Sequence, residues 1–337
     1  MSTPEPAPPL RGAIVGLGMM GRHHARLLQS MPRIAFAGAV DPAGDRHGAV
    51  RDQALVHDSV EELLDRGRPE LAIVAVPTDE HLAVARALAE AGVHMLIEKP
   101  LAGSVDEGEQ IIAACRAGGV RATVGHVERF NPALIELRRR TEQGQVGEVF
   151  LIGTERCGPF PDRVKDVGVV KDLATHDLDL VGWLGKSAID LLAAQTVHRT
   201  GREHEDLVLV TGRLQAGLAF SITVDWLTPT KIRRMRILGD RGMLVADTLT
   251  SDLVFHENGH VTSEWDSSQA LRGVAEGDST RYALHRREPL LAELEAFCDF
   301  VLGDDDSPTV SLEEGLQTVR CAEQVLESAR SSQTVRM

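Results

Sequence analysis

Hydrophobic positions in the first 125 residues form short apolar runs that alternate with amphipathic stretches. The amphipathic stretches predict helices at residues 22–29, 59–66, 81–91 and 104–118. The apolar runs predict buried strands at residues 13–15, 34–40, 71–76, 93–97 and 120–124. Strands that alternate with helices in this way form a doubly wound parallel sheet, an α/β fold whose ligand lies at the carboxyl ends of the strands.

The pattern changes near residue 148, where the apolar runs become longer and more β-branched. Short links between these runs predict antiparallel pairing. Phe220, Ile222, Val224 and Trp226 alternate with small or polar residues, which is typical of a sheet with one buried face and one open face. The predicted strands are 149–153, 188–197, 207–214, 218–227, 232–238 and 243–245, and the predicted helices are 171–184, 289–302 and 312–328.

A glycine-rich loop joins the first predicted strand to the first predicted helix. Gly16 permits a tight turn, Gly18 lets the backbone approach a pyrophosphate, and Gly21 lets the helix pack closely on the sheet. Asp41 ends the next strand, where its carboxylate can bind both ribose hydroxyls and repel the 2′-phosphate of NADP. The loop predicts an NAD site. A glycine turn with an incidental aspartate is the alternative, and Arg46 softens the preference against NADP.

Composition limits the classes of function. A formal charge of −14 argues against nucleic acid and anionic membrane surfaces as partners, and no apolar run approaches the roughly 20 residues of a membrane span. The proline-rich residues 1–10 are expected to be a disordered leader without a signal-peptide core. The four cysteines are scattered without metal-ligand or disulfide spacing, which favours a reducing cytoplasm. A zinc site built from His126, Glu128 and His176 is disfavoured, because these residues also lack metal-ligand spacing.

Two motifs can carry acid–base chemistry. Glu98-Lys99-Pro100 follows a parallel strand, so Lys99 can face a nicotinamide ring, whose positive charge favours a neutral amine that accepts a proton from an alcohol. Asp172 and His176 are four residues apart on a predicted helix, where the carboxylate can orient the imidazole or bind a substrate hydroxyl. A surface lysine and an Asp–His pair in a helix cap are the structural alternatives.

Residues 125–132 lie at the predicted domain junction and are rich in hydrogen-bonding groups. Their sequence, Gly-His-Val-Glu-Arg-Phe-Asn-Pro, predicts a hinge that faces the substrate. An Asn-Pro helix start is the structural interpretation, and the two are compatible.

The ordered set of motifs resembles that of the Gfo/Idh/MocA oxidoreductases. The set comprises the glycine loop, Pro77-Thr78-x-x-His81, Glu98-Lys99-Pro100 and Asp172-x-x-x-His176, and the resemblance covers roughly residues 10–330. It implies an NAD-binding Rossmann domain at 11–130 and, at 131–337, an α+β domain with an open, mostly antiparallel sheet. The C-terminal helices are expected to pack back toward the first domain, and the sheet is expected to form homodimers or homotetramers.

The resemblance also implies roles for individual residues. Lys99 is expected to be catalytic and to precede a cis proline, with His176 as proton relay and Asp172 as its acidic partner; Ala174 replaces a frequent glycine of the family. The expected NAD contacts are Gly16, Gly18, Met19, Met20, Gly21, Asp41, Pro77, Thr78, His81, Glu98, Lys99 and His126. The expected sugar contacts are Lys99, Glu128, Arg129, Asn131, Arg163, Lys165, Asp172 and His176.

A narrower branch is similar in residues 125–132, 168–173 and 288–294. It contains UDP-N-acetylglucosamine 3-dehydrogenases and aminoglycoside-pathway hexose 3-dehydrogenases. The similarity implies oxidation of a hexose at C3 to a ketone that an aminotransferase then uses. The alternatives are an NAD-dependent glycosidase that oxidises C3 transiently and a nucleotide-sensing regulator.

The charge of the substrate stays open at this stage. The phosphates of a UDP-sugar need cations, and Arg129, Arg156, Arg163 and Lys165 are the candidates. An aminoglycoside needs acids, and Glu128, Asp162, Asp166 and Asp177 are the candidates.

Overall fold

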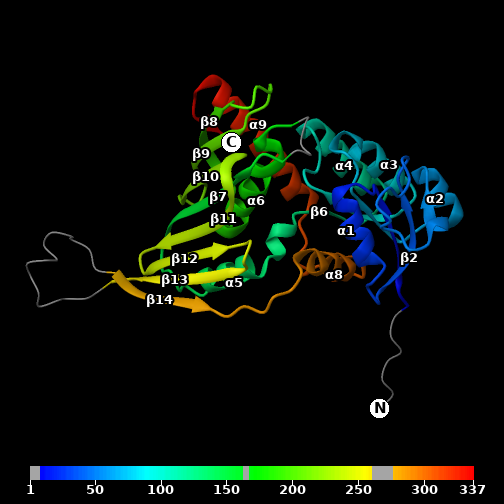
Figure 1. Cartoon of the computed structure of the whole chain (residues 1–337), viewed down its shortest axis with the longest axis horizontal. Helices are drawn as coiled ribbons and strands as arrows, with labels where there is room; N and C mark the ends of the chain where they lie inside the picture. Colours follow the sequence, from blue (N-terminus) through cyan, green and yellow to red (C-terminus); the bar gives the residue numbers. More distant parts are fainter. Residues whose placement is uncertain (1–7, 162–166, 260–275) are drawn as a thin grey trace, which may run out of the picture. The chain divides into compact units, whose positions relative to one another are not determined.

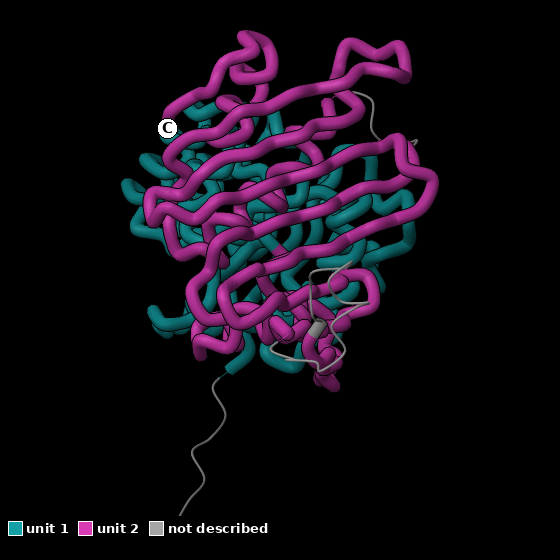
Figure 2. Tube along the Cα trace, turned by 90° about the vertical axis from the view of Figure 1, so that its left-hand side faces the viewer, with its two compact units in different colours: residues 1–126, 290–320 teal, residues 127–289, 321–337 magenta. Residues whose placement is uncertain are grey.

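The computed structural model describes residues 8–161, 167–259 and 276–337 (Figure 1). The chain divides into two compact units, residues 1–126 with 290–320 and residues 127–289 with 321–337 (Figure 2). Residues 290–320, from the C-terminal part of the chain, belong to the first unit. Their Val310 and Leu316 join its apolar core, and the hydroxyl of Thr123 donates to the carbonyl of Val310 (2.7 Å).

The first unit contains a parallel sheet in the order β3-β2-β1-β4-β5-β6, which confirms the predicted doubly wound fold. The strand order reverses at β1, where such folds bind their ligands. The strands are β1 (Leu10–Val15), β2 (Ile34–Val40), β3 (Val56–His57), β4 (Leu71–Val74), β5 (His94–Glu98) and β6 (Ala122–Gly125). The helices are α1 (Met19–Leu28), α2 (Val60–Gly67), α3 (His81–Glu90), α4 (Val105–Ala117) and α8 (Pro289–Val301), with 3-10 turns η1 (Gln53–Leu55) and η2 (Thr78–Glu80).

Serine side chains fix the beginnings of two of these helices. The hydroxyl of Ser59 accepts a hydrogen bond from the main-chain N–H of Glu62, and Ser104 does the same for Glu107 (3.3 Å each). Each hydroxyl satisfies an N–H that has no partner within its helix, so the sequence sets where α2 and α4 start.

The second unit is built on a nine-stranded sheet in the order β14-β13-β12-β11-β7-β10-β9-β8-β15. All its pairs are antiparallel except β7 with β10, which confirms a mostly antiparallel sheet. Its strands are β7 (Val149–Pro159), β8 (Ile189–Val197), β9 (Leu207–Leu214), β10 (Ala219–Asp225), β11 (Leu227–Gly239), β12 (Gly242–Asp247), β13 (Asp252–Asn258), β14 (Glu276–Tyr282) and β15 (Val335–Arg336). Its helical elements are η3 (Val127–Phe130), α5 (Pro132–Glu142), the π-helical turn η4 (Val170–Ala174) and α6 (Thr175–Gly185), while α9 (Leu312–Ser331) begins in the first unit and ends in the second.

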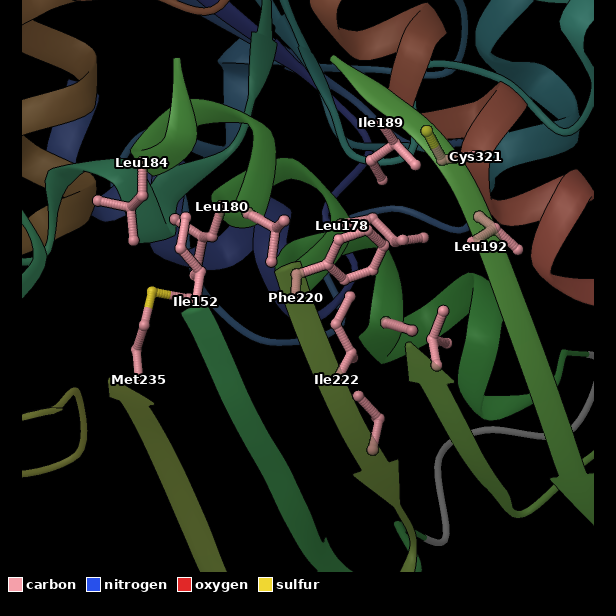
Figure 3. Packing of buried hydrophobic residues seen from close by; sticks show 14 of the residues in the cluster. Ile152, Leu178, Leu180, Leu184, Ile189, Leu192, Phe220, Ile222, Met235 and Cys321 are labelled. Atoms are coloured by element: carbon pink, nitrogen blue, oxygen red, sulfur yellow. The ribbon is translucent and has the colours of Figure 1, made fainter. Parts of the chain in front are cut away.

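The core of the second unit lies between the sheet and α6. Phe220 and Ile222 of β10 point toward Leu178 and Leu180 of α6, beside Ile152 of β7 (Figure 3). The predicted alternation on β10 is confirmed, because its apolar set is at most 3% exposed. Burial of these side chains on one face anchors α6, which carries the predicted catalytic residue His176.

Several elements escaped the sequence prediction, among them the turns η1, η2 and η3 and the body of α5. Strands β3, β13, β14 and β15 were not predicted, and the helix expected from residue 171 starts as a π-helical turn. Strand β14 is polar in sequence and depends on its pairing with β13. Within the described parts of the chain, no helix is long and apolar enough to cross a membrane.

Close contact between α1 and β1 gives the first prediction. A Cβ atom at Gly21 would overlap the carbonyl oxygen of Gly16, whereas a Cβ at Gly18 would meet nothing within 4 Å. Gly21→Ala should therefore lower the free energy of unfolding by about 1–3 kcal/mol or more, measured by urea denaturation. Gly18→Ala is the matched control and should stay within about 1 kcal/mol of the wild type. Equal effects of the two substitutions would contradict this account of the loop.

Candidate active site

The glycine loop follows β1 and leaves the N-terminus of α1 open. Gly16 has a φ of +94°, which favours glycine, and its N–H donates to the carbonyl of Val40 (2.7 Å). No side chain caps α1, and its first turn has no acidic residue. Together with the open space at Gly18, these features suit an anionic pyrophosphate at the positive end of the helix. The residues therefore fit the NAD that the loop predicts.

Asp41 connects the glycine loop to the end of β2. One carboxylate oxygen accepts a hydrogen bond from the main-chain N–H of Leu17 (2.9 Å), and the other accepts one from Ala43 (2.9 Å). Each oxygen can accept a second hydrogen bond, so the side chain can bind a ribose diol while it holds the loop. Arg46, five residues downstream in the sequence, is exposed.

The Glu98-Lys99-Pro100 turn lies at the carboxyl end of β5, and its Lys99–Pro100 peptide is cis, as predicted. Glu98 is 7% exposed; one carboxylate oxygen lies 2.7 Å from Nε2 of His24, and the other accepts a hydrogen bond from the Lys99 N–H (3.2 Å). Burial opposes ionisation of Glu98, but the hydrogen bond from His24 and the charges of His24 and Lys99 outweigh it, so the pKa of Glu98 is lowered. Glu98 is thus a fixed anion that orients the turn before Lys99.

His81 lies between the main chain that follows β4 and the main chain that follows this turn. Its two ring nitrogens lie 3.2 Å from the carbonyl oxygens of Val76 and Leu101. Burial lowers the pKa of His81, and its contacts with the two carbonyls and the charge of Glu98 only partly offset this effect. The described contacts of His81 are structural, and its contact with NAD stays a prediction.

In the second unit, Asp172 lies in the π-helical turn η4 and His176 in the first turn of α6, both half-buried. The π-helical turn changes the spacing on which their shared face was predicted, and such turns are frequent at functional sites. The catalytic roles of both residues therefore stay predictions that the structure leaves open.

Two buried arginines bind acids that flank His176 on α6. Arg156 of β7 pairs with Asp177 (2.6 Å) and with Glu128 (2.9 Å), and Arg129 makes a bidentate pair with Asp179 (2.9 and 2.7 Å). Burial disfavours the charged form of Arg156, but Asp177 and Glu128 outweigh it and raise its pKa. These arginines already neutralise buried carboxylates, so phosphate binding would have to break strong ion pairs.

The remaining predicted sugar contacts divide into two groups. Asn131 caps α5, since its side-chain oxygen accepts from the Ala133 N–H (3.0 Å) and its amide donates to the carbonyl of Thr248 (3.1 Å). This supports the Asn-Pro helix start. Arg163 and Lys165, together with Asp162 and Asp166, lie outside the described residues. Among the residues that the structure does describe, no three metal-binding side chains lie together.

The chain matches two models of known protein families. One model, described as an oxidoreductase family with an NAD-binding Rossmann fold, matches residues 10–126. A second, the C-terminal alpha/beta domain of the same oxidoreductase family, matches residues 138–337. The chain belongs to the Gfo/Idh/MocA oxidoreductase family. As a Gfo/Idh/MocA oxidoreductase it is an NAD-dependent enzyme, which confirms the predicted family, enzyme class and cofactor.

Among related family members, the UDP-N-acetylglucosamine 3-dehydrogenase of Acidithiobacillus ferrooxidans is 28% identical over 87% of this chain and 88% of its own length. Its solved structure aligns with a TM-score of 0.81 and 26% identity, over 96% of this chain and 98% of that one. The myo-inositol dehydrogenase Hyg17 of Streptomyces leeuwenhoekii is 34% identical, over 54% of this chain and 58% of its own. GenD2 from gentamicin A biosynthesis, solved with NAD, shares the fold (TM-score 0.79, 21% identity, 100% and 99% coverage).

Two features of the site escaped sequence reasoning. His24 is fully buried on α1, and its pairing with Glu98 joins positions 74 residues apart. A histidine on the apolar face of an amphipathic helix was the available signal, although that pattern more often marks a core residue. Asp177 was considered only as a substrate ligand, whereas it anchors Arg156.

The geometry at Asp41 yields a test of cofactor choice. Asp41→Asn keeps an oxygen that can accept from Leu17 but removes the charge that repels a 2′-phosphate. We expect the preference for NAD over NADP to fall by about tenfold or more, measured from the two dissociation constants. Arg46→Ala in the same background should weaken NADP alone. An unchanged preference in Asp41→Asn would assign the discrimination to other residues.

Proposed function

We propose that this enzyme is a sugar dehydrogenase that oxidises C3 of a UDP-hexosamine to a ketone. The observation that carries the proposal is that Lys99 and the glycine loop share one sheet edge, since β1 and β5 both flank β4. Similarity to the UDP-N-acetylglucosamine 3-dehydrogenase extends over 87% of the chain, whereas the match to the inositol dehydrogenase spans 54%. This difference favours a sugar nucleotide.

In this proposal the residues of the first unit bind the cofactor and remove the proton. The open N-terminus of α1 binds the pyrophosphate, and Asp41 binds the adenosine ribose. Bound NAD supplies the hydride acceptor. Lys99 takes the proton from the C3 hydroxyl, while Glu98, fixed by His24, holds the turn that aims the lysine. General base catalysis of this kind contributes about 10²–10⁴-fold to the rate.

The second unit supplies the groups that orient the alcohol. His176 donates to the C3 oxygen or passes its proton onward, and Asp172 orients the imidazole or binds a neighbouring hydroxyl. The ion pairs of Asp177 and Asp179 hold α6, so the position of His176 follows from them. Because Arg129 and Arg156 are neutralised, we assign the phosphates of the substrate to Arg163 and Lys165.

We also propose a homo-oligomer that forms through the open face of the sheet, and an aminotransferase that consumes the ketone in the cytoplasm. Ser221 and Thr223 of β10 and Glu155 of β7 lie on that face, opposite the core side chains, and Leu209 of β9 is 43% exposed there. A nucleotide-sensing regulator is the weaker hypothesis, since it has no need for Lys99, Asp172 and His176 together.

The substrate proposal is tested by NADH formation at 340 nm. Purified enzyme with NAD is given UDP-hexosamines in one series and deoxystreptamine-linked pseudo-oligosaccharides in the other, with an aminotransferase and amino donor to remove the ketone. We expect a signal with the UDP-sugars. A signal with the aminoglycosides alone would reverse the choice of substrate, and glycosidic cleavage without net NADH would support the glycosidase.

Removal of the Lys99 amine tests the proposed base. Lys99→Met should lower kcat by about 10²–10⁴-fold and leave the dissociation constant of NAD within about threefold, because the side chain acts on the alcohol. Lys231→Met removes an exposed lysine of β11 and is the matched control, with no expected change. Normal turnover of Lys99→Met at saturating NAD would exclude Lys99 as the base.

A further inference from the structure

Helix α8 places a carboxyl group inside the first unit. Glu293 is 2% exposed on the buried face of α8, between Leu290 and Leu294 in the sequence. Both of its carboxyl oxygens are buried and have no hydrogen-bond partner among the described residues. A buried ionisable group without a partner is costly, so its position in this helix calls for a function.

The surroundings of Glu293 are the groups that fix the catalytic turn. Glu98 of β5 is close enough for its charge to act on Glu293, and Glu98 is paired with His24 of α1. Nδ1 of His24 is also buried without a partner among the described residues. The other titratable groups near Glu98 are Lys99 on the same turn and His81 of α3. Helices α1 and α8 and strand β5 thus contribute an imidazole and two carboxyls to one buried region of the first unit.

The two carboxyl groups differ in their charge. Burial raises the pKa of Glu293 well above its usual range, and the negative charge of Glu98 adds to this effect. The pKa of Glu98 is lowered, because His24 and Lys99 outweigh its burial. The absence of partners at Glu293 favours its neutral form, whereas the contacts of Glu98 with His24 and the Lys99 N–H favour a carboxylate there. Neighbouring carboxyl groups whose environments push their pKa values apart often mark proton-exchange sites.

We propose that Glu293 is a proton-exchange site coupled to the charge of the nicotinamide ring. It releases its proton to solvent when the oxidised, positively charged ring binds, and it regains a proton from solvent once the ring has become neutral. The inference rests on the proposed function, which assigns the nicotinamide to the Glu98–Lys99 turn. This proton is additional to the hydroxyl proton that Lys99 accepts. Glu98 retains 10% side-chain exposure and offers a path to solvent.

Two consequences follow for cofactor binding. The affinity for NAD⁺ should rise with pH, since the ionised pair attracts the cationic ring, and the affinity for NADH should lack this dependence. Glu293 would then make the enzyme favour the oxidised cofactor at higher pH. Glu293 does not touch the substrate; it acts by changing the charge of the Glu293–Glu98 pair.

The test measures protons released on binding, without any sugar. The full-length protein is titrated calorimetrically with NAD⁺ and with NADH at several pH values, in buffers that differ in ionisation enthalpy. We expect the wild type to release more protons with NAD⁺ than Glu293→Gln does, by up to about one proton. Lys99→Met separates the contribution of the lysine and should retain the Glu293 part. Glu295→Gln, a partly buried carboxyl on the same helix, is the matched control and should behave as wild type.

Equal proton release and equal pH dependence in Glu293→Gln and wild type would overturn the proposal. Failure of the proposed function looks different, because proton release would persist while no sugar yields NADH.

A second measurement covers a variant that binds the cofactor poorly: thermal unfolding of the cofactor-free protein is followed as a function of pH. Stability from a protonated Glu293 is present below about pH 4.5 and is lost as pH rises through its raised folded pKa. The melting temperature of Glu293→Gln, or of Glu293→Met, should therefore increase relative to that of the wild type as pH rises. A difference in melting temperature that does not change with pH would contradict the proposal.

Discussion

The close approach of α1 to the glycine loop that follows β1 is the constraint on which the first unit depends. Only glycine at position 21 lets the helix lie against the carbonyl of Gly16. This contact places the open helix end for the pyrophosphate, and one turn later it places His24 against Glu98. One helix position therefore sets both the phosphate site and the turn that carries Lys99. A displacement of α1 would disturb the proposed pyrophosphate site and the proposed base Lys99 together.

Helix α6 has the equivalent role in the second unit. It carries His176, and its next residues include the acids that pair with Arg156 and Arg129. Buried ion pairs add little net stability, but loss of one partner leaves an uncompensated charge that is strongly destabilising. The pairs therefore restrict how α6 can sit on the sheet, while its apolar face packs on Phe220 and Ile222. Because Arg129 and Arg156 form these pairs, they are less suited to bind the phosphates of a substrate.

Local signals made most of the first unit predictable, because strand period, glycine spacing and serine caps act within a few residues. They located the glycine loop and Asp41, whereas the cis Lys99–Pro100 peptide was implied by the family resemblance. Contacts between distant segments could not be inferred from one sequence. The His24–Glu98 pair joins α1 to β5, and β14 is polar and acquires strand structure only through β13. The π-helical turn that contains Asp172 depends likewise on packing, and helical spacing cannot reveal it.

The account depends most on the claim that the hydride leaves C3 of the sugar. The direct measurement uses the active UDP-hexosamine labelled with deuterium at C3 and determines the label in the nicotinamide product by mass spectrometry. The account predicts that NADH carries one deuterium at C4 and that turnover slows when the label is present. Unlabelled NADH from the C3-labelled sugar, or label that exchanges into water, would contradict it.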